Sequence, residues 1–388
     1  MKLRLMDLLR CPRCLTPLKL EIFDQYQVKP EEVHKGVRCT SFCAHLGTSL
    51  GEVSEAHVPC EICYETEIRD GVLLCECGAI YPVYQGVPRL CLDSLQEQQT
   101  YRSRYHLELK FYLQERNEVD LGQTVVSEKR TQRSFSLEWY FFDYSDRTWG
   151  WTVEERKTLF LEDLHLEAQS LKGRLLLDAG CGNGALTAAL TDFGLETVGI
   201  DLSDSVERGA VQNDRAYTHF VQASVMTPPF KRRSFDLVFS SGVLHHTPDT
   251  RAAFRSIAEL CVEGGRTYIW VYHREKGARY RVADAVRSVV NHMPSLLQHL
   301  FCLGLIPLYI AKDQVREKLG GKAAPNYNWE EYAVAIMDTY TPEFRFAHTP
   351  DEVMNWFREA GFEYVVHSST NERGFGVFGD FRPLSETK

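Results

Sequence analysis

The sequence predicts an α/β fold, a doubly wound sheet of seven strands that follows a small cysteine-rich domain, and three observations predict it. An apolar run at residues 175–177 ends in Asp178 and is followed by glycines 180, 182 and 184, which stand at every second position before a helix-like segment. Further apolar runs then alternate with helical segments, a pattern typical of a mainly parallel sheet. Nine of the twelve cysteines lie in the first 91 residues.

Each element of the predicted sheet has its own signal. Residues 235–240 form a nearly unbroken apolar run, as a strand buried on both faces requires. Helices are expected at 185–190, 250–261 and 351–359. The strands expected beside them are 175–178, 196–201, 220–224, 235–240, 264–272, 362–368 and 374–381. This alternation indicates a Rossmann-like fold with helices on both faces of the sheet.

Length and charge limit the architecture and the partners. At 388 residues the chain is longer than most single domains. We expect a cysteine-rich domain at 1–95, a linker with helices and an aromatic lid at 96–170, and the main domain at 171–388 with an insertion at 273–348. A net charge of −9 disfavours binding to nucleic acid. No secretory signal and no bilayer-length apolar segment is evident, so we expect a cytoplasmic protein without a transmembrane segment.

The glycine run predicts a nucleotide cradle. A strand, a glycine turn and a helix start form such a cradle at the carboxyl edge of a parallel sheet. The spacing is G-x-G-x-G after Asp178, which differs from the G-x-G-x-x-G of dinucleotide dehydrogenases. Asp201, at the tip of the next strand, suits a ribose that needs a hydrogen-bond acceptor. The loop resembles the S-adenosylmethionine loop of class I methyltransferases.

Four segments in order, LDAGCGNG, GID, FDLVFSSGVLHH and EGGRTYIWVY, resemble the ubiquinone/menaquinone-type small-molecule methyltransferases. The resemblance implies that Asp178 and the glycines contact the methionine part of S-adenosylmethionine, that Asp201 binds its ribose and that Leu202 flanks its adenine. Ser224 stands where the family usually has an acid. The full set of expected cofactor contacts is Asp178, Gly180, Cys181, Gly182, Asn183, Gly184, Asp201, Leu202, Ala223, Ser224 and Ser240.

The early cysteines predict zinc. C-x-x-C pairs at 11/14 and 60/63 and a C-x-C pair at 75/77 present thiolates at spacings that suit Zn²⁺. Residues 9–18 and 71–90 resemble the small zinc domain that activates some tRNA and protein methyltransferases, although the C-x-C pair and the insert at 21–70 depart from it. We expect one or two structural zinc ions.

The pairing of the cysteines is open at this stage. In one pairing Cys11, Cys14, Cys75 and Cys77 bind one ion, and Cys39, Cys43, Cys60 and Cys63 bind a second. In the other, Cys60, Cys63, Cys75 and Cys77 share an ion, which leaves Cys11, Cys14, Cys39 and Cys43. His34, His45 and His57 could substitute for a cysteine.

Two regions are expected to form the acceptor side. Trp139 and Tyr140 belong to an aromatic stretch that could close over the cofactor or form a seam between domains. The insertion 273–348 would cover the acceptor pocket with Tyr340 and His348, and its apolar part, 293–311, suits an apolar acceptor or a homodimer contact. His245 and His246 follow the fourth strand, where either could take a proton, or could instead pack in the core or cap the next helix.

These observations favour an S-adenosylmethionine-dependent methyltransferase that acts on a small organic acceptor, such as a secondary-metabolite precursor, a sugar-linked intermediate or a quinone-like ring. The first alternative is a tRNA or rRNA methyltransferase whose zinc domain recognises the substrate. The second is a non-catalytic scaffold or activator that retains the fold.

Overall fold

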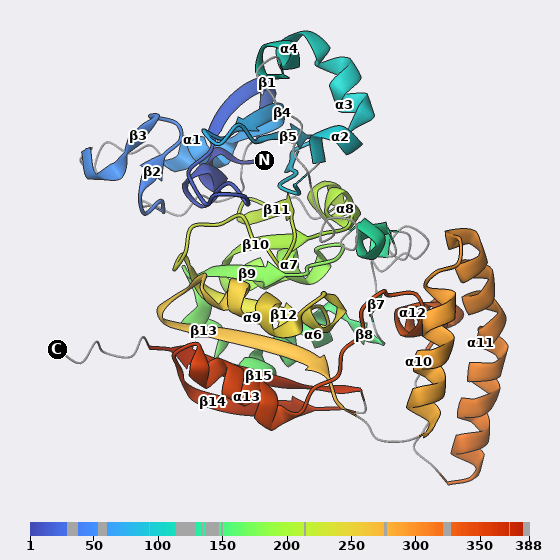
Figure 1. Cartoon of the computed structure of the whole chain (residues 1–388). Helices are drawn as coiled ribbons and strands as arrows, with labels where there is room; N and C mark the ends of the chain where they lie inside the picture. The colour runs from blue at the N-terminus through green and yellow to red at the C-terminus, as the bar shows by residue number, and fades with distance from the viewer. Residues whose placement is uncertain are drawn as a thin grey trace.

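A computed structural model provides the structure of the chain. It describes residues 1–28, 38–52, 60–92, 94–113, 129–133, 135–136, 147–148, 150–212, 215–274, 278–320, 327–371 and 373–382. Figure 1 shows the cysteine-rich region stacked above the large sheet, with a helical insertion beside it.

The large sheet has seven strands in the order β11-β10-β9-β12-β13-β15-β14. The first five are parallel, and β15 runs antiparallel to both of its neighbours. The strands are β9 (Leu175–Ala179), β10 (Glu196–Asp201), β11 (Thr218–Gln222), β12 (Phe235–Ser241), β13 (Cys261–Tyr272), β14 (Phe362–Thr370) and β15 (Gly374–Phe381). The predicted α/β class is confirmed.

Helices cover both faces of this sheet because its strands are apolar on both sides. Leu176 packs with Phe160 and Leu186 on one face, under α6 (Val153–Leu164) and α7 (Ala185–Ala189). Leu177 packs with Phe254 on the other face, under α9 (Thr250–Ala258) and α13 (Pro350–Glu359). The other elements here are α8 (Ser205–Gln212), η4 (Ala168–Leu171), η5 (Leu190–Phe193) and η6 (Leu244–His246).

The predicted strands differ from the observed ones only at their ends. β10 and β15 have the predicted bounds, whereas β11 begins at Thr218 rather than 220. Helix α9 ends at Ala258, earlier than predicted, since β13 already begins at Cys261 and pairs there with Phe235.

The N-terminal region is built on an antiparallel sheet in the order β1-β4-β5-β6. Its strands are β1 (Lys19–Gln27), β4 (Thr66–Leu74), β5 (Ile80–Tyr84) and β6 (Val87–Pro88). Tyr101 and Leu109, from the helices that follow, pack on Val72 and Tyr84 of this sheet. The remaining elements are η1 (Leu3–Asp7), β2 (Phe42–Cys43), β3 (Thr48–Ser49), η2 (Leu50–Glu52), α1 (Cys60–Glu65), α2 (Ser94–Glu97), α3 (Gln99–Arg104) and α4 (His106–Leu113).

The N-terminal region is docked on the β11 edge of the large sheet (Figure 1). The backbone N–H of Leu90 donates to the carbonyl of Gln222 at 2.8 Å, and that of Arg10 donates to the carbonyl of Pro229 at 2.8 Å. The buried guanidinium of Arg89 donates to the side chain of Gln222 at 2.9 Å. Apolar residues of both regions form one continuous core, so the two regions make a single body.

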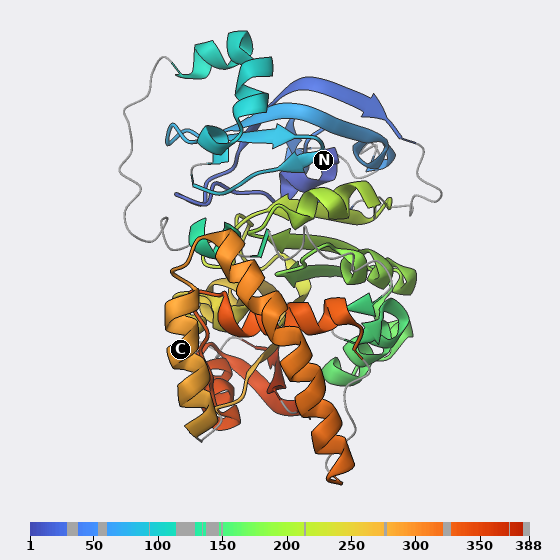
Figure 2. The ribbon, with the colours of Figure 1, turned by 90° about the vertical axis from the view of Figure 1, so that its right-hand side faces the viewer.

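The insertion forms three helices, α10 (Ala278–Val290), α11 (Ser295–Lys318) and α12 (Trp329–Tyr340). Much earlier in the chain, β7 (Arg147–Thr148) and β8 (Trp151–Thr152) form a short hairpin. Helices α10 and α11 stand beside the large sheet (Figure 2), while α12 is largely buried. Within the described parts of the chain, none of the helices combines the length and apolarity needed to cross a bilayer.

Candidate functional site

The glycine loop after β9 adopts a conformation that requires glycine. Gly180, Gly182 and Gly184 have φ angles of +92°, +56° and +73°. A Cβ on Gly180 would lie 2.1 Å from a methyl carbon of Val243, and one on Gly184 would lie 2.2 Å from the ring of Phe220. The chain therefore makes a tight turn with its backbone close to neighbouring elements, and Gly184 leads directly into α7.

Two buried carboxylates flank this loop. Asp201, at the end of β10, accepts hydrogen bonds from the backbone N–H groups of Gly182 at 2.9 Å and Ser203 at 2.8 Å. Asp178 accepts from the hydroxyl of Thr187 at 2.6 Å, and burial raises the pKa of Asp178 to about 6. A carboxylate has about four acceptor positions, so Asp178 can accept further hydrogen bonds. The hydroxyl of Ser203 also donates to Asp201, at 2.6 Å, which leaves Asp201 fewer free positions.

The other predicted cofactor residues lie at the same edge of the sheet, since Leu202 follows β10, Ala223 and Ser224 follow β11, and Ser240 lies near the end of β12. The hydroxyl of Ser224 accepts from the backbone N–H of Met226 at 3.1 Å. Ser240 is fully buried and donates to the carbonyl of Ala179 at 2.7 Å, so its proton holds β12 to β9. Asn183 caps the start of α7 through the N–H of Ala185 at 3.2 Å, beside Cys181. Cofactor contact by these residues stays a prediction.

The two predicted histidines lie in η6 and have different surroundings. His246 Nδ1 is 3.0 Å from the carbonyl oxygen of Phe344, and its Nε2 is 3.2 Å from Oδ1 of Asp338 in α12. A carbonyl oxygen can only accept, so Nδ1 carries a proton. Its Nε2 faces the Asp338 carboxylate at ion-pair distance, so this contact ties η6 to α12.

Asp338 is held ionised by its neighbours. Burial alone would raise its pKa, but hydrogen bonds with His246 and the hydroxyl of Tyr272, together with the charge of Arg345, lower it. Tyr272 lies at the end of β13, so the cluster joins three distant parts of the chain: η6, β13 and α12.

His245 has no such partners. It is fully buried, and neither ring nitrogen has a hydrogen-bond partner in the described structure. Its ring centroid lies 4.0 Å from that of Tyr272 and 4.3 Å from that of His246. Burial, together with the positive charge of His246, holds the pKa of His245 well below its usual value, so this ring is neutral.

The predicted lid and cap residues are only partly brought to this cluster. Trp139 and Tyr140 lie outside the described residues, but Phe135 of the same aromatic stretch contacts His246 with ring centroids 5.4 Å apart. Tyr340 instead bonds the hydroxyl of Tyr309 at 3.0 Å among the inserted helices. His348 Nδ1 lies 3.2 Å from a carboxylate oxygen of Glu352 in α13.

Sequence reasoning underrated some residues of this cluster. Asp338 lies in the predicted insertion 273–348, and the sequence gives no sign of its partner His246, which lies 92 positions away. Tyr272 was assigned only as a strand residue. Arg156 in α6 was not singled out, yet its positive charge acts on Asp178. A local motif could not have identified these pairs.

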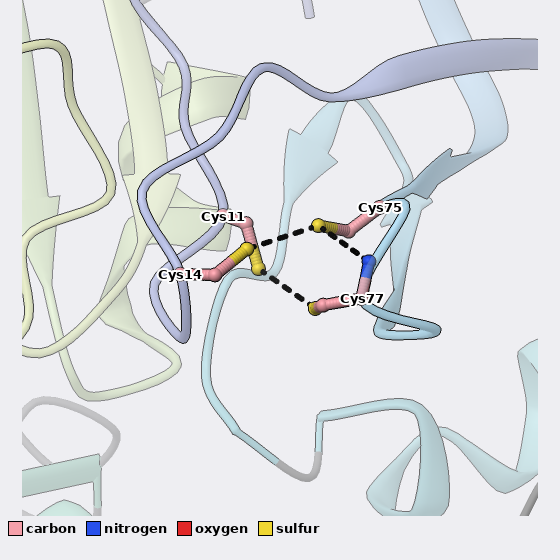
Figure 3. A group of neighbouring side chains, drawn as sticks. All are labelled: Cys11, Cys14, Cys75 and Cys77. Carbon is pink, nitrogen blue, oxygen red and sulfur yellow. Dashed lines mark hydrogen bonds between the residues drawn. The ribbon is translucent and has the colours of Figure 1, made fainter.

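Four thiols of the N-terminal region converge as a tetrahedral metal site requires. The Sγ atoms of Cys11, Cys14, Cys75 and Cys77 all lie within 4.8 Å of one another (Figure 3). Cys11 and Cys77 are 3.8 Å apart and Cys14 and Cys75 are 3.3 Å apart. A tetrahedron with Zn–S bonds of about 2.3 Å has edges of about 3.8 Å, so the donor set fits Zn²⁺.

This group of four cysteines is the first ion site of the first predicted pairing. Cys75 and Cys77 gather with Cys11 and Cys14 and not with Cys60 and Cys63, so the second pairing is not the one found among the described residues. A second ion at Cys39, Cys43, Cys60 and Cys63 stays a prediction. Cys39, Cys43, Cys60 and Cys63 are all buried, and Cys63 interacts with Cys43 and with the backbone N–H of His45. His34 and His57 lie outside the described residues.

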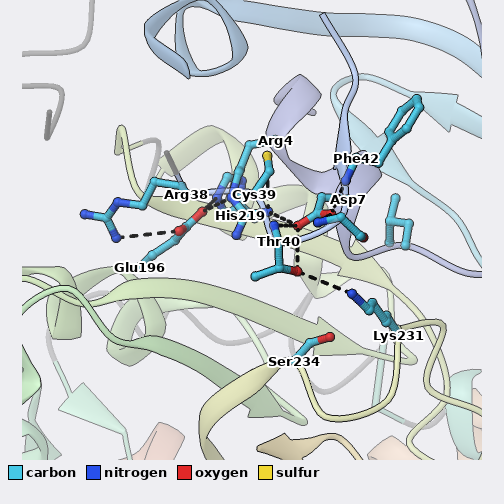
Figure 4. Close-up of polar contacts among 12 residues, drawn as sticks. Arg4, Asp7, Arg38, Cys39, Thr40, Phe42, Glu196, His219, Lys231 and Ser234 are labelled. Atoms are coloured by element: carbon cyan, nitrogen blue, oxygen red, sulfur yellow. Dashed lines mark hydrogen bonds and ion pairs between the residues drawn. The ribbon is translucent and has the colours of Figure 1, made fainter. Parts of the chain in front are cut away.

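A buried charge cluster joins this second group of cysteines to the large sheet (Figure 4). Glu196, the first residue of β10, lies 3.2 Å from Nε of Arg4 and 3.0 Å from Nε2 of His219. Arg4 also contacts Asp7 at 3.2 Å and Sγ of Cys39 at 3.8 Å. The N-terminal region is thus tied by charge to the amino end of the strand whose other end carries Asp201.

Comparison with known proteins supports this architecture. Residues 177–269 match a family model described as a methyltransferase domain. The ubiquinone biosynthesis O-methyltransferase of Coxiella burnetii is 26% identical over 134 residues, which cover 34% of this chain and 57% of that protein. The 27-O-demethylrifamycin SV methyltransferase of Amycolatopsis mediterranei is 35% identical over 148 residues, covering 32% and 53%. The chain spans little more than half the length of these relatives.

Among solved structures, the magnesium protoporphyrin IX methyltransferase of Synechocystis with bound S-adenosylhomocysteine is similar at 14% identity, with a TM-score of 0.36 and coverage of 74% of this chain and 100% of that one. The family match includes the glycine loop, the strands from β9 to most of β13, and both histidines of η6. Residues 177–269 are therefore similar to a methyltransferase domain.

Proposed function

We propose that the protein transfers a methyl group from S-adenosylmethionine to a small organic acceptor. The observation that carries this proposal is the contact between Gly180 of the glycine loop and Val243, two residues before His245. This contact brings the glycine loop close to the cluster of His245, His246 and Tyr272, which supports a cofactor cradle beside that cluster. In open α/β sheets, ligands bind outside the carboxyl ends of the strands, which is where both features lie.

The residues of the glycine loop fit the proposed cofactor. Their backbone would hold the methionine part between Asp178 and Asp201, and Asp201 would accept from the ribose hydroxyls. When bound, the sulfonium supplies an electrophilic methyl group. The chain then has to align the acceptor in line with that group and exclude water.

The relatives favour an oxygen acceptor, since both matched proteins methylate small molecules and one is named as an O-methyltransferase. A hydroxyl must lose a proton when it is methylated. Neutral His245 has an unpartnered ring nitrogen that could accept this proton. His246, held between Asp338 and the carbonyl of Phe344, would fix the position of the loop.

Calorimetric titration with S-adenosylhomocysteine tests the donor side. We expect wild-type protein to bind it, and an Asp201→Asn variant to bind it about tenfold or more weakly, because a charge-assisted hydrogen bond is lost. Asp192→Asn, which changes an exposed carboxylate paired with Lys157, is the matched control and should bind normally. Equal binding by Asp201→Asn would refute the site assignment, and no binding by the wild type would refute the proposed function.

We also propose two structural zinc ions in the N-terminal region. Cys11, Cys14, Cys75 and Cys77 would bind one, and the buried group of Cys39, Cys43, Cys60 and Cys63 would bind the other. Elemental analysis of the purified protein should find two zinc ions per chain. Cys14→Ser and Cys60→Ser should each lose one, whereas Cys91→Ser should lose none. A single zinc that survives Cys60→Ser would remove the second site.

A further inference from the structure

Arg345 lies beside the histidine cluster, where its charge acts on Asp338 although no ion pair joins the two in the described structure. Its guanidinium carbon is 4.4 Å from the ring centroid of Tyr272. Its Nε is buried and has no hydrogen-bond partner, and in the described structure no carboxylate lies within ion-pair distance of its guanidinium. A buried Nε–H without an acceptor is costly unless a ligand accepts from it.

The backbone fixes Arg345 at this position. The N–H of Phe346 donates to the carbonyl of His245 at 2.9 Å, and the carbonyl of Phe344 accepts from His246. Residues on either side of Arg345 are therefore bonded to η6. Arg345 and His245, two polar side chains without partners, both lie against Tyr272.

The electrostatic balance around Tyr272 is positive. Arg345 and Arg373, at the turn before β15, both act on the hydroxyl of Tyr272 and on Asp338. Among the groups that act on the hydroxyl of Tyr272, a single carboxylate, Asp338, faces two guanidiniums, those of Arg345 and Arg373. The cofactor proposed for the neighbouring cradle adds a sulfonium, which makes a neutral acceptor a poor match for the site.

We propose that the acceptor carries an acidic oxygen group, a carboxylate or an ionisable phenol, which Arg345 binds with the ring N–H of His245. This inference rests on the proposed function, because it names the acceptor class of that same site. Arginine suits the role since its planar fork donates two parallel hydrogen bonds to a carboxylate. The surrounding rings of Tyr272, Trp270 and Phe135 favour an acid attached to a flat ring.

The test compares benzoate with benzamide, which have the same shape but differ in charge. Each is titrated into full-length protein, with and without saturating S-adenosylhomocysteine, and binding is followed by ligand-observed NMR. We expect wild-type protein to bind benzoate about tenfold more tightly than benzamide, the preference that one charge-assisted pair provides. Arg345→Gln should remove the preference, and Arg345→Lys should retain part of it.

The control variant is Arg251→Gln, which removes an exposed arginine paired with Glu359 and should keep the preference. The affinity for S-adenosylhomocysteine should be unchanged in Arg345→Gln, which shows that the variant is folded. Wild-type protein without a preference for benzoate, or Arg345→Gln with an unchanged preference, would overturn the inference. Absence of S-adenosylhomocysteine binding would instead refute the proposed function, and the benzoate titration without it would still report on Arg345.

Discussion

The donor side and the acceptor side of the proposed site are built in different ways. The donor side comes from one short stretch, residues 178–201, in which Asp201 bonds directly back to Gly182. The acceptor side is assembled from His246, Tyr272, Asp338 and Arg345, which belong to separate elements. A local motif can be recognised in the sequence, whereas a site assembled from distant elements forms only when the chain folds.

The donor side is also held at the opposite end of strand β10. Glu196 begins the strand that ends at Asp201, and it is buried with Arg4, Tyr64 and His219 between the N-terminal region and the large sheet. No comparable link to the N-terminal region holds the acceptor side among the described residues. Breaking the Glu196 cluster should therefore destabilise the whole body rather than the acceptor cluster alone.

The largest expected effect is on stability. Glu196→Gln should lower the free energy of unfolding by about 3–5 kcal/mol, because it removes one of the two buried acids that face Arg4 and also the acid that faces His219. Urea unfolding measures this, with Glu154→Gln, which changes an exposed carboxylate, as the control. A loss below about 1 kcal/mol would contradict the bracing role.

The same cluster predicts how stability depends on pH. Burial alone would raise the pKa of Glu196, but the charge of Arg4 and the bond with His219 outweigh it and lower this pKa to about 2. Its contribution to stability, about 3 kcal/mol, should be complete above the unfolded value of about 4.5 and be lost as pH falls toward 2. Burial also lowers the pKa of His219, which adds a loss in the same direction below about 6.5. In Glu196→Gln, urea unfolding at a series of pH values should show no loss assignable to residue 196 below about 4.5.

The next effect isolates the donor loop. Gly180→Ala should weaken S-adenosylhomocysteine binding about a hundredfold, because the new methyl group overlaps Val243 and the φ angle is left-handed. Gly264→Ala has a similar φ angle of +76° but nothing within 4 Å of the new Cβ, so it controls for the backbone cost alone. Restoration of binding by adding Val243→Ala would attribute the loss to the overlap, and normal binding by Gly180→Ala would show that the loop is not the cradle.

The sequence predicted the sheet well because neighbouring residues determine each strand and each turn. Apolar runs and glycine turns placed all seven strands to within a few residues, and β10 and β15 exactly as observed. The thiol site was predicted only as one of two pairings, since C-x-x-C spacing does not reveal which pairs meet across strand β4. The contact between Asp338 and His246 could not be predicted from the sequence, because the insertion is long and its sequence does not indicate where α12 packs against the sheet.

The smallest expected effect tests the acceptor side. Asp338→Asn keeps the shape of the side chain but removes the charge that lies 3.2 Å from His246 Nε2, so the η6 loop loses the ion-pair contact that fixes it to α12. Once an acceptor has been identified, kcat should fall about tenfold to a hundredfold. The affinity for S-adenosylhomocysteine should not change, since Asp338 belongs to neither the glycine loop nor β10. Asp313→Asn, which removes another buried carboxylate of the inserted helices, bonded there to Tyr332, should leave kcat near the wild-type value. If Asp338→Asn weakened cofactor binding as much as turnover, the two sides would be one coupled unit, and the distinction between a contiguous donor side and an assembled acceptor side would fail.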